Sequence, residues 1–138
     1  MKTLGISQHK LAILNNVSGS VMHALKKSDS GFANFGEIYF SKIKYKNIKA
    51  WKRHTKMTMN LVVPVGRVKF VFYSEEKNIF EEYILGENNY IRLTVNPLLW
   101  FGFQGMDEGK NLVMNIANIE HDPNEVERKN LMDLKYIW

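Results

Sequence analysis

Three side chains that can carry a charge or a proton recur at alternate positions just before an apolar run. Lys52, His54 and Lys56 lie in the stretch IKAWKRHTKMTMNLVVPVG, which runs from Ile48 to Gly66. Alternate side chains of an extended strand project from one face, so we expect these three to share a face. Two ammonium groups beside an imidazole favour an anionic ligand, and an imidazole titrates near neutral pH. This face is therefore a candidate site for an anionic small molecule.

Other kinds of chemistry find little support in the residues. The chain has no cysteine, which excludes disulfides, thiolate metal ligands and cysteine nucleophiles. Gly-rich phosphate loops and serine triads are also missing from the sequence. A metal at His54 would face Lys52 and Lys56, whose charges would repel it. We expect neither a metal nor a cofactor.

The charge pattern points to anionic partners. The net charge is +5, and residues 42–56 hold seven Lys or Arg and no Asp or Glu. Part of this run fits a solvated strand edge, where lysines oppose edge pairing. Tyr45 and Trp51 lie within it, as in a nucleic-acid surface, but no recognised nucleic-acid motif accompanies them. The chain also lacks a signal-peptide core or an apolar span of about 18 residues, so we expect a cytoplasmic protein that binds neither nucleic acid nor membrane.

The elements that must position these residues read as short strands. Their near-regular spacing, without long helical patterns between them, predicts an all-β fold, an antiparallel sandwich or barrel, in a single domain over residues 1–138. Leu61 and Val63 should pack inside. Asp122 and Pro123 predict one short helical turn near the C-terminus. The expected strands are residues 36–43, 48–66, 67–73, 79–85, 90–95, 99–104 and 111–118, preceded by short extended segments within residues 4–25 that break at 15–16 and 18–20.

The aromatic group Trp100, Phe101 and Phe103 has two interpretations. The three rings could fill the core, or a subset could form a stacking wall for a base or sugar ring. Alternation places Phe101 and Phe103 on one face of the strand and Trp100 on the other. Both interpretations stay open on the sequence alone.

With the strands laid out, the chain resembles the cupin family of dTDP-4-dehydrorhamnose 3,5-epimerases and the related nucleotide-sugar 3,4-ketoisomerases. The resemblance covers roughly residues 18–138 and rests on GEIYFSKI, IKAWKRH leading into NLVVPVG, RLTVNPLLWFGFQG, HDPNEVERKNL and the closing YIW. It implies a cupin-type (jelly-roll) β-barrel, a homodimer whose first strands cross to the partner, and metal-independent proton transfer next to a 4-keto group. The substrate it implies is a nucleoside-diphosphate sugar, dTDP-linked, used for surface polysaccharide.

The resemblance also assigns positions within this sequence. Lys52 occupies the position of the epimerase base, Asn115 that of the tyrosine acid, and Phe101 that of a further active-site histidine. His54 matches the second histidine of an HAH-like stretch in the ketoisomerases. The catalytic group is therefore expected to be His54 as base, Lys52 as the cation that stabilises an enolate or phosphate, and Asn115 as a hydrogen-bond donor.

Substrate contacts are expected from Lys56, Arg53 and Arg92 at the diphosphate, and from Phe101 and Phe103 at a ring. Without an acid facing the base, a proton should return to the side it left, or exchange should occur at one carbon only. Two functions follow from these residues. The first is an epimerase or isomerase of a 4-keto-6-deoxy sugar nucleotide, and the second is a non-catalytic cupin that binds a nucleotide sugar or related sugar.

Overall fold

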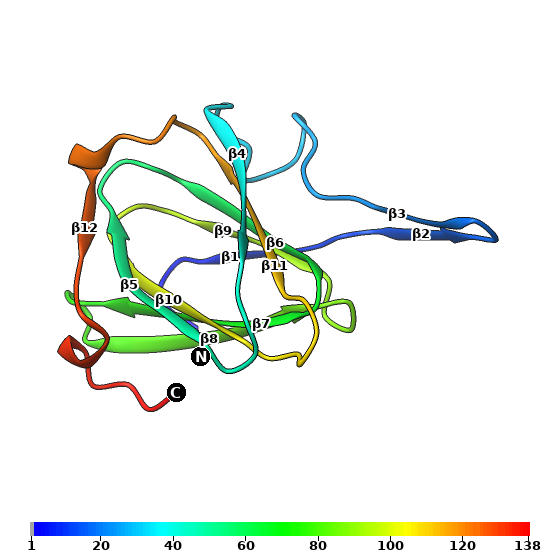
Figure 1. Cartoon of the computed structure of the whole chain (residues 1–138). Coiled ribbons are helices and arrows are strands. Elements are labelled where there is room, and N and C mark those ends of the chain that lie inside the picture. The colour runs from blue at the N-terminus through cyan, green and yellow to red at the C-terminus, as the bar shows by residue number, and fades with distance from the viewer. Residues whose placement is uncertain (1) are drawn as a thin grey trace.

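Two antiparallel β-sheets face each other and enclose most of the core, while a separate hairpin extends away from them (Figure 1). The computed structural model describes residues 2–138. One sheet has the strand order β1-β9-β6-β11-β4, and the other has the order β12-β5-β10-β7-β8. The strands are β1 (Ser7–Lys10), β2 (Ile13–Asn16), β3 (Gly19–Met22), β4 (Glu37–Lys42), β5 (Ile48–His54), β6 (Met59–Val65), β7 (Arg67–Ser74), β8 (Ile79–Gly86), β9 (Ile91–Val95), β10 (Trp100–Gly105), β11 (Leu112–Ala117) and β12 (Val126–Arg128).

The core lies between the sheets because the strands alternate apolar side chains toward it. Leu61 and Val63 of β6 are buried there, as the sequence predicts. Phe70 and Phe72 of β7 face the same core, whereas Val71 points to the opposite face of its sheet. Burial of these rings supplies much of the hydrophobic stabilisation that holds the two sheets together.

A second apolar cluster covers the outer face of the sheet that contains β5. Trp51, Val71 and Trp100 form its buried part, and the C-terminal residues Tyr136 and Trp138 pack against it. The C-terminal segment thus lies beside β12 and closes over this face (Figure 1). Phe101 and Phe103 belong to the inner core while Trp100 belongs to the outer cluster, which confirms the alternation expected for this strand.

The expected barrel is only partly realised. The fold is all-β and antiparallel, but the hydrogen-bonded ladders form two separate sheets and do not close into a barrel. The edges are β1 and β4 in one sheet and β12 and β8 in the other. The expected helical turn follows Asp122 and is a 3₁₀ turn, Pro123–Glu125. The Asp122 side chain accepts a hydrogen bond from the Asn124 backbone N–H. A second 3₁₀ turn spans Leu131–Asp133.

The hairpin β2–β3 differs from the breaks expected near the N-terminus. Asn15 and Asn16 belong to β2, and the turn falls at residues 17–18. Asn16 explains this placement, because its side-chain oxygen accepts a hydrogen bond from the Ser18 N–H and so forms the turn itself. Leu14 and Val21 are exposed on this hairpin. None of the helices within residues 2–138 is long and apolar enough to cross a bilayer.

Candidate active site

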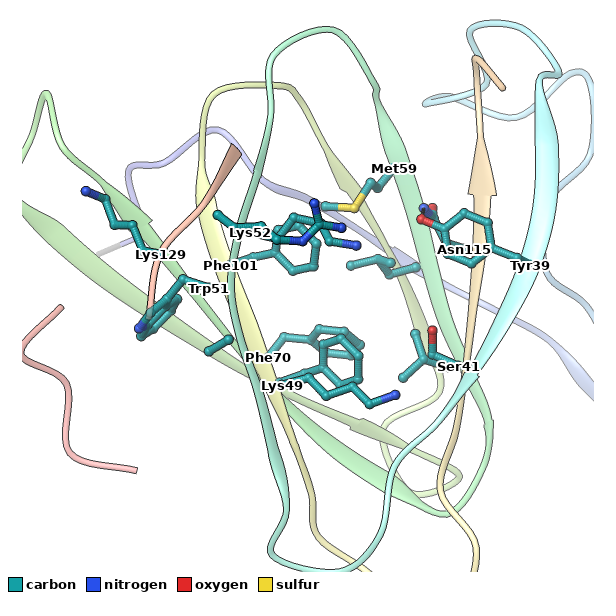
Figure 2. Close-up of a pocket in the computed structure, with 15 residues that line it drawn as sticks. Tyr39, Ser41, Lys49, Trp51, Lys52, Met59, Phe70, Phe101, Asn115 and Lys129 are labelled. Atoms are coloured by element: carbon teal, nitrogen blue, oxygen red, sulfur yellow. Dashed lines mark hydrogen bonds between the residues drawn. The ribbon is translucent and has the colours of Figure 1, made fainter. Parts of the chain in front are cut away.

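A cavity of about 400 Å³ opens between the two sheets (Figure 2). Its volume lies in the range of small-molecule sites, about 300–1,000 Å³. One wall comes from β5 and β10, the opposite wall from β4 and β11, and β12 contributes cations. The lining residues are Tyr39, Ser41, Lys49, Ala50, Trp51, Lys52, Met59, Leu61, Phe70, Phe101, Phe103, Val113, Asn115, Arg128 and Lys129.

An irregularity in β5 sets which of its side chains reach this cavity. In the ladder with β10, Phe101 pairs with Lys52 and Gly102 pairs with Ala50, so Trp51 is the extra residue of a bulge. A bulge shifts the alternation of side chains by one position. Lys49 and Lys52 can therefore both line the cavity, and Trp51 joins the outer cluster. Strict alternation along the sequence does not reveal this shift.

His54 ends β5 one step beyond Lys52 on the same wall. Its side chain is buried, and its ring stacks on that of Phe101, a cavity-lining residue, at 5.9 Å between centroids. His54 Nδ1 donates a hydrogen bond to Glu125 Oε1 at 2.5 Å. That bond leaves the lone pair on Nε2, which is buried without a hydrogen-bond partner among the described residues. The imidazole is thus in the tautomer that accepts a proton at Nε2; it lies against Phe101 and is not itself among the residues that line the cavity.

Glu125 is held in place by the pairing of β12 with β5. Val126 lies opposite His54 in this ladder, so the preceding residue, Glu125, reaches the end of β5. Its second oxygen accepts hydrogen bonds from the backbone N–H groups of Thr55, Lys56 and Met57, at 3.1, 3.1 and 3.2 Å. Burial raises the pKa of Glu125, but these bonds and the bond from His54 outweigh it and hold the pKa below its usual value. The carboxylate is therefore ionised.

The electrostatics of His54 favour the neutral base. Burial lowers the pKa of His54, Glu125 offsets part of that effect, and Lys52 lowers the pKa further. A neutral imidazole at pH 7 is the form that accepts a proton. Glu125 was not among the residues expected at the site, although its place in the turn capped by Asp122 was a signal that the segment is fixed.

Lys52 is the cation that lies closest to this imidazole along the wall. Burial lowers the pKa of the Lys52 ammonium, and Arg128, its cross-strand neighbour, lowers it further. Together with Lys49, these residues gather three cations around the cavity, whereas the Lys129 ammonium lies on the outer face, 3.8 Å from Glu75 Oε1 and over the Trp100 ring. An anion bound among the three cations would relieve their mutual repulsion.

The opposite wall carries an amide and a phenol. Asn115 of β11 and Tyr39 of β4 are direct cross-strand partners, and Asn115 Nδ2 donates to Tyr39 Oη at 2.9 Å. Asn115 Oδ1 is buried and unpartnered among the described residues. Figure 2 shows this pair facing Lys52 and Phe101 across the cavity. Tyr39 was not among the residues expected at the site.

The two phenylalanines fill the core, as one interpretation of the sequence held, and stacking of a ligand ring on them stays a prediction. Phe101 and Phe103 belong to the core cluster and also line the cavity. Phe101 covers one face of His54, so a ligand in the cavity meets the phenyl ring next to the base.

Two expected contacts lie away from the cavity. Lys56 is exposed in the bend after β5, because the strand ends at His54 and the face shared with Lys52 ends there too. Arg53 points to the outer face, where it binds Glu127 at 3.0 Å and Glu75 at 3.3 Å. These placements correct the expectation that both side chains share the site.

Arg92 is also placed elsewhere. It is 1% exposed and donates to Asn60 Oδ1 and to the backbone oxygens of Ala24 and Ser30, at 3.0, 2.9 and 2.7 Å. Its guanidinium thereby fixes residues 24–30 against β9, and it is absent from the cavity lining. Within residues 2–138, no group of three or more His, Cys, Asp or Glu side chains is arranged to hold a metal ion.

Comparison with known structures identifies the class of protein. The crystal structure of a dTDP-sugar isomerase from Desulfovibrio desulfuricans superposes with a TM-score of 0.90 at 35% sequence identity, covering 94% of this chain and 86% of that one. The fold is thus that of a sugar-nucleotide isomerase of the cupin type. The chain belongs to the dTDP-sugar isomerase family. This confirms the resemblance found in the sequence.

More distant structures share the fold. A variant of a 3,4-ketoisomerase from Thermoanaerobacterium thermosaccharolyticum, bound to TDP-4-keto-6-deoxyglucose, gives a TM-score of 0.79 at 18% identity over 93% of this chain and 90% of that one. A dTDP-4-dehydrorhamnose 3,5-epimerase from Sulfolobus tokodaii gives 0.83 at 17% identity over 97% and 82%. Searches against protein-family models and against curated proteins found no match.

Proposed function

We propose that this protein is a sugar-nucleotide epimerase or isomerase that transfers a proton next to the 4-keto group of a dTDP-linked 4-keto-6-deoxy sugar. The observation that carries the proposal is the His54–Glu125 pair beside a cavity lined by cations. Its support from comparison is the 35% identity to a dTDP-sugar isomerase over most of both chains. The pathway is the synthesis of a surface polysaccharide.

Proton removal falls to His54. The ketone acidifies the neighbouring C–H bond, His54 Nε2 takes that proton, and the bonding electrons move toward the carbonyl oxygen to give an enolate. Glu125 holds the ring in the required tautomer and stabilises the imidazolium that forms, through the 2.5 Å bond to Nδ1. Lys52, the expected alternative base, has to lose its proton first, whereas His54 is already neutral.

Lys52 then acts as the cation of the site. It lies next to His54 on the same wall, where it can stabilise the enolate oxygen or the diphosphate. Arg128 and Lys49 extend this positive surface and are the contacts for the diphosphate in place of Lys56, Arg53 and Arg92. Phe101 and Phe103 offer apolar area for a ring, and Asn115 offers an amide on the far wall.

A homodimer is part of the proposal. The hairpin β2–β3 extends from the body of the protein with Leu14, Val17 and Val21 exposed, which leaves an apolar surface for a second copy (Figure 1). Light scattering at micromolar concentration measures this directly, and the mass of a single chain would contradict the dimer.

The alternative function is a cupin that binds a nucleotide sugar without converting it. Tyrosine and histidine are missing at the positions of Asn115 and Phe101, which is the feature that favours it. Incubating the protein with a panel of 4-keto-6-deoxy sugar nucleotides in D₂O separates the two functions. An epimer or isomer observed by NMR supports the enzyme, whereas saturable binding with no exchange of any C–H bond supports the binding protein and overturns the enzyme.

A further inference from the structure

Trp51 is the residue of β5 that the bulge turns outward. In the ladder with β10, Ala50 pairs with Gly102. The next pair joins Lys52 to Phe101, so the ladder skips Trp51. The Trp51 ring is 2% exposed and belongs to the outer cluster. Figure 2 shows this ring on the side of β5 that faces away from the cavity. The bulge thus decides which side chains of β5 reach the site.

Without the bulge, β5 would present different residues to the cavity. A continuous ladder would place Trp51 opposite Phe101, on the inner face. Lys52 would then lie opposite Trp100, on the outer face, and His54 would also point outward, because alternate residues of a strand share a face. A shift of one residue exchanges the two faces of a strand. The base and the cation of the proposed mechanism therefore face inward only in the bulged register.

The C-terminal segment holds Trp51 in its outward position. The backbone N–H of Trp51 donates to the Lys129 oxygen, and the Lys129 N–H donates to the Trp51 oxygen, each at 3.1 Å. The indole Nε1–H donates to the backbone oxygen of Leu131 at 3.1 Å. The rings of Tyr136 and Trp138 lie 6.3 and 5.4 Å from the Trp51 ring, measured between centroids. All three polar groups of Trp51 are thus bonded to the segment that follows β12.

Trp138 lies directly over the bulge. Gly102, which is opposite Ala50, has no side chain, and Trp138 Cη2 is 3.1 Å from the place where a Cβ of Gly102 would lie. The glycine therefore leaves room for the indole at the step where the register shifts. Lys69 Nζ of β7 lies 5.4 Å from the centre of the Trp138 ring and 5.5 Å from that of Tyr136, which adds cation–π contacts. These contacts fix the indole against the sheet.

We infer that Trp138 is a positioning residue, which packs against Trp51 and so keeps Lys52 and His54 on the inner face of β5. The inference rests on the proposed function, because it concerns how the base and the cation of that function are placed. Trp138 is absent from the cavity lining, so its effect has to pass through β5. It is also absent from the inner core, so the two sheets should stay packed when its ring is removed.

A double-mutant cycle on dTDP binding, measured by calorimetry, tests whether Trp138 acts through Lys52. Trp138→Ala should weaken binding about threefold to tenfold, and Lys52→Ala about tenfold or more. The double variant should bind no more weakly than Lys52→Ala alone, because a displaced ammonium that is already missing cannot be lost again. If the two losses multiply, Trp138 acts independently of Lys52 and the inference is overturned.

Deuterium exchange into a 4-keto sugar nucleotide gives the second readout. Trp138→Ala should slow exchange about 10–10²-fold at a temperature where it stays folded, because a small displacement of a reacting group has an effect of this size. Trp138→Phe keeps a ring on Trp51 and should recover most of the rate. Ile137→Ala, at an exposed neighbour, should behave as wild type. Leu85→Ala destabilises the inner core on β8, away from β5, and should keep the wild-type rate per folded molecule.

Trp51→Phe replaces Trp138→Ala if that variant does not fold, because it keeps a ring and removes only the indole N–H that binds Leu131. The same non-additivity with Lys52→Ala is expected. Exchange at the wild-type rate in Trp138→Ala, or equal slowing in Leu85→Ala, would overturn the inference while exchange by wild type still supports the proposed function. If wild type bound dTDP without exchanging any C–H bond, the proposed function would fail and the binding cycle alone would decide the inference. Absence of both binding and exchange in wild type would overturn both.

Discussion

Replacing Glu125 by glutamine tests the His54–Glu125 pair without changing the size of the side chain. The carboxylate accepts one bond from His54 and three from backbone N–H groups, and Glu125 is 1% exposed. Glutamine keeps one acceptor oxygen and turns the other into an N–H₂ group that faces donors. Because His54 is neutral, the cost is that of buried N–H donors left without an acceptor, about 1–3 kcal/mol for each, so we expect about 3–5 kcal/mol in total.

Two readouts of Glu125→Gln follow from that cost. For a chain of this size, about 3–4 °C of melting temperature is lost per kcal/mol, so the melting temperature should fall by roughly 9–20 °C at pH 7. Deuterium exchange into the substrate should slow by about 10²–10⁴-fold, because the ring loses its tautomeric preference and the stabilisation of the imidazolium. Thermal unfolding and NMR exchange rates measure the two effects on one sample.

The pH dependence of the same variant gives a third readout. The pKa of Glu125 is lowered in the folded protein, so its contribution to stability is present above its unfolded pKa of about 4.3 and is lost as the pH falls. The difference in stability between wild type and Glu125→Gln should therefore shrink in acid. Since Glu125 raises the pKa of His54, the acid limb of the exchange rate should move to lower pH in the variant.

Glu127→Gln is the matched control. Glu127 is two residues away, and its exposed carboxylate binds Arg53 on the outer face. Surface pairs contribute about 0–1 kcal/mol, so this variant should unfold within a few degrees of wild type. If Glu125→Gln has the melting temperature and pH profile of wild type, the pair neither stabilises the fold nor tunes the base, and the reasoning is refuted.

The remaining predictions concern two cations. Lys52→Ala should weaken binding of a nucleoside diphosphate about tenfold or more, measured by calorimetry, because a charge-assisted contact contributes about 1.5–3 kcal/mol. Lys56→Ala is the control, because Lys56 lies outside the cavity, and it should leave the affinity unchanged. Equal losses of affinity in both variants would contradict the assignment. Arg92→Ala should lower the free energy of unfolding by about 3 kcal/mol or more, because Asn60 Oδ1 and two backbone oxygens lose their hydrogen-bond donor. Arg67 is half-exposed and serves as the control: Arg67→Ala should lower the free energy of unfolding by less than about 1 kcal/mol. If Arg92→Ala unfolded like wild type but no longer bound the nucleotide, Arg92 would belong to the substrate site after all.

Local sequence patterns predicted most of the strands. The alternation in RVKFVFY places Phe70 and Phe72 inward and Val71 outward, and the structure confirms it. Period-two burial is a local property, so each strand reports it without knowledge of its neighbours. The pairing of β12 with β5 is different, because more than 70 residues separate His54 from Glu125 and no local pattern connects them.

The site was harder to predict for the same reason. His54, Lys52 and Asn115 were chosen from one strand and from a family resemblance, and the structure places all three at or beside the cavity. Tyr39 was missed because its position across from Asn115 depends on the register of β4 against β11. Lys56 was misplaced because β5 ends at His54, so the Lys56 side chain no longer shares a face with Lys52. The alternation of residue types in the sequence does not reveal where the strand ends.

The central claim is that His54 removes a proton next to the ketone of a sugar nucleotide. NMR of a dTDP-linked 4-keto-6-deoxy sugar in D₂O, with wild type and His54→Gln at equal concentration, tests it most directly. We predict loss of the C–H signal next to the carbonyl with wild type and a rate at least about 10²-fold lower with His54→Gln. Exchange by His54→Gln at the wild-type rate would contradict the account.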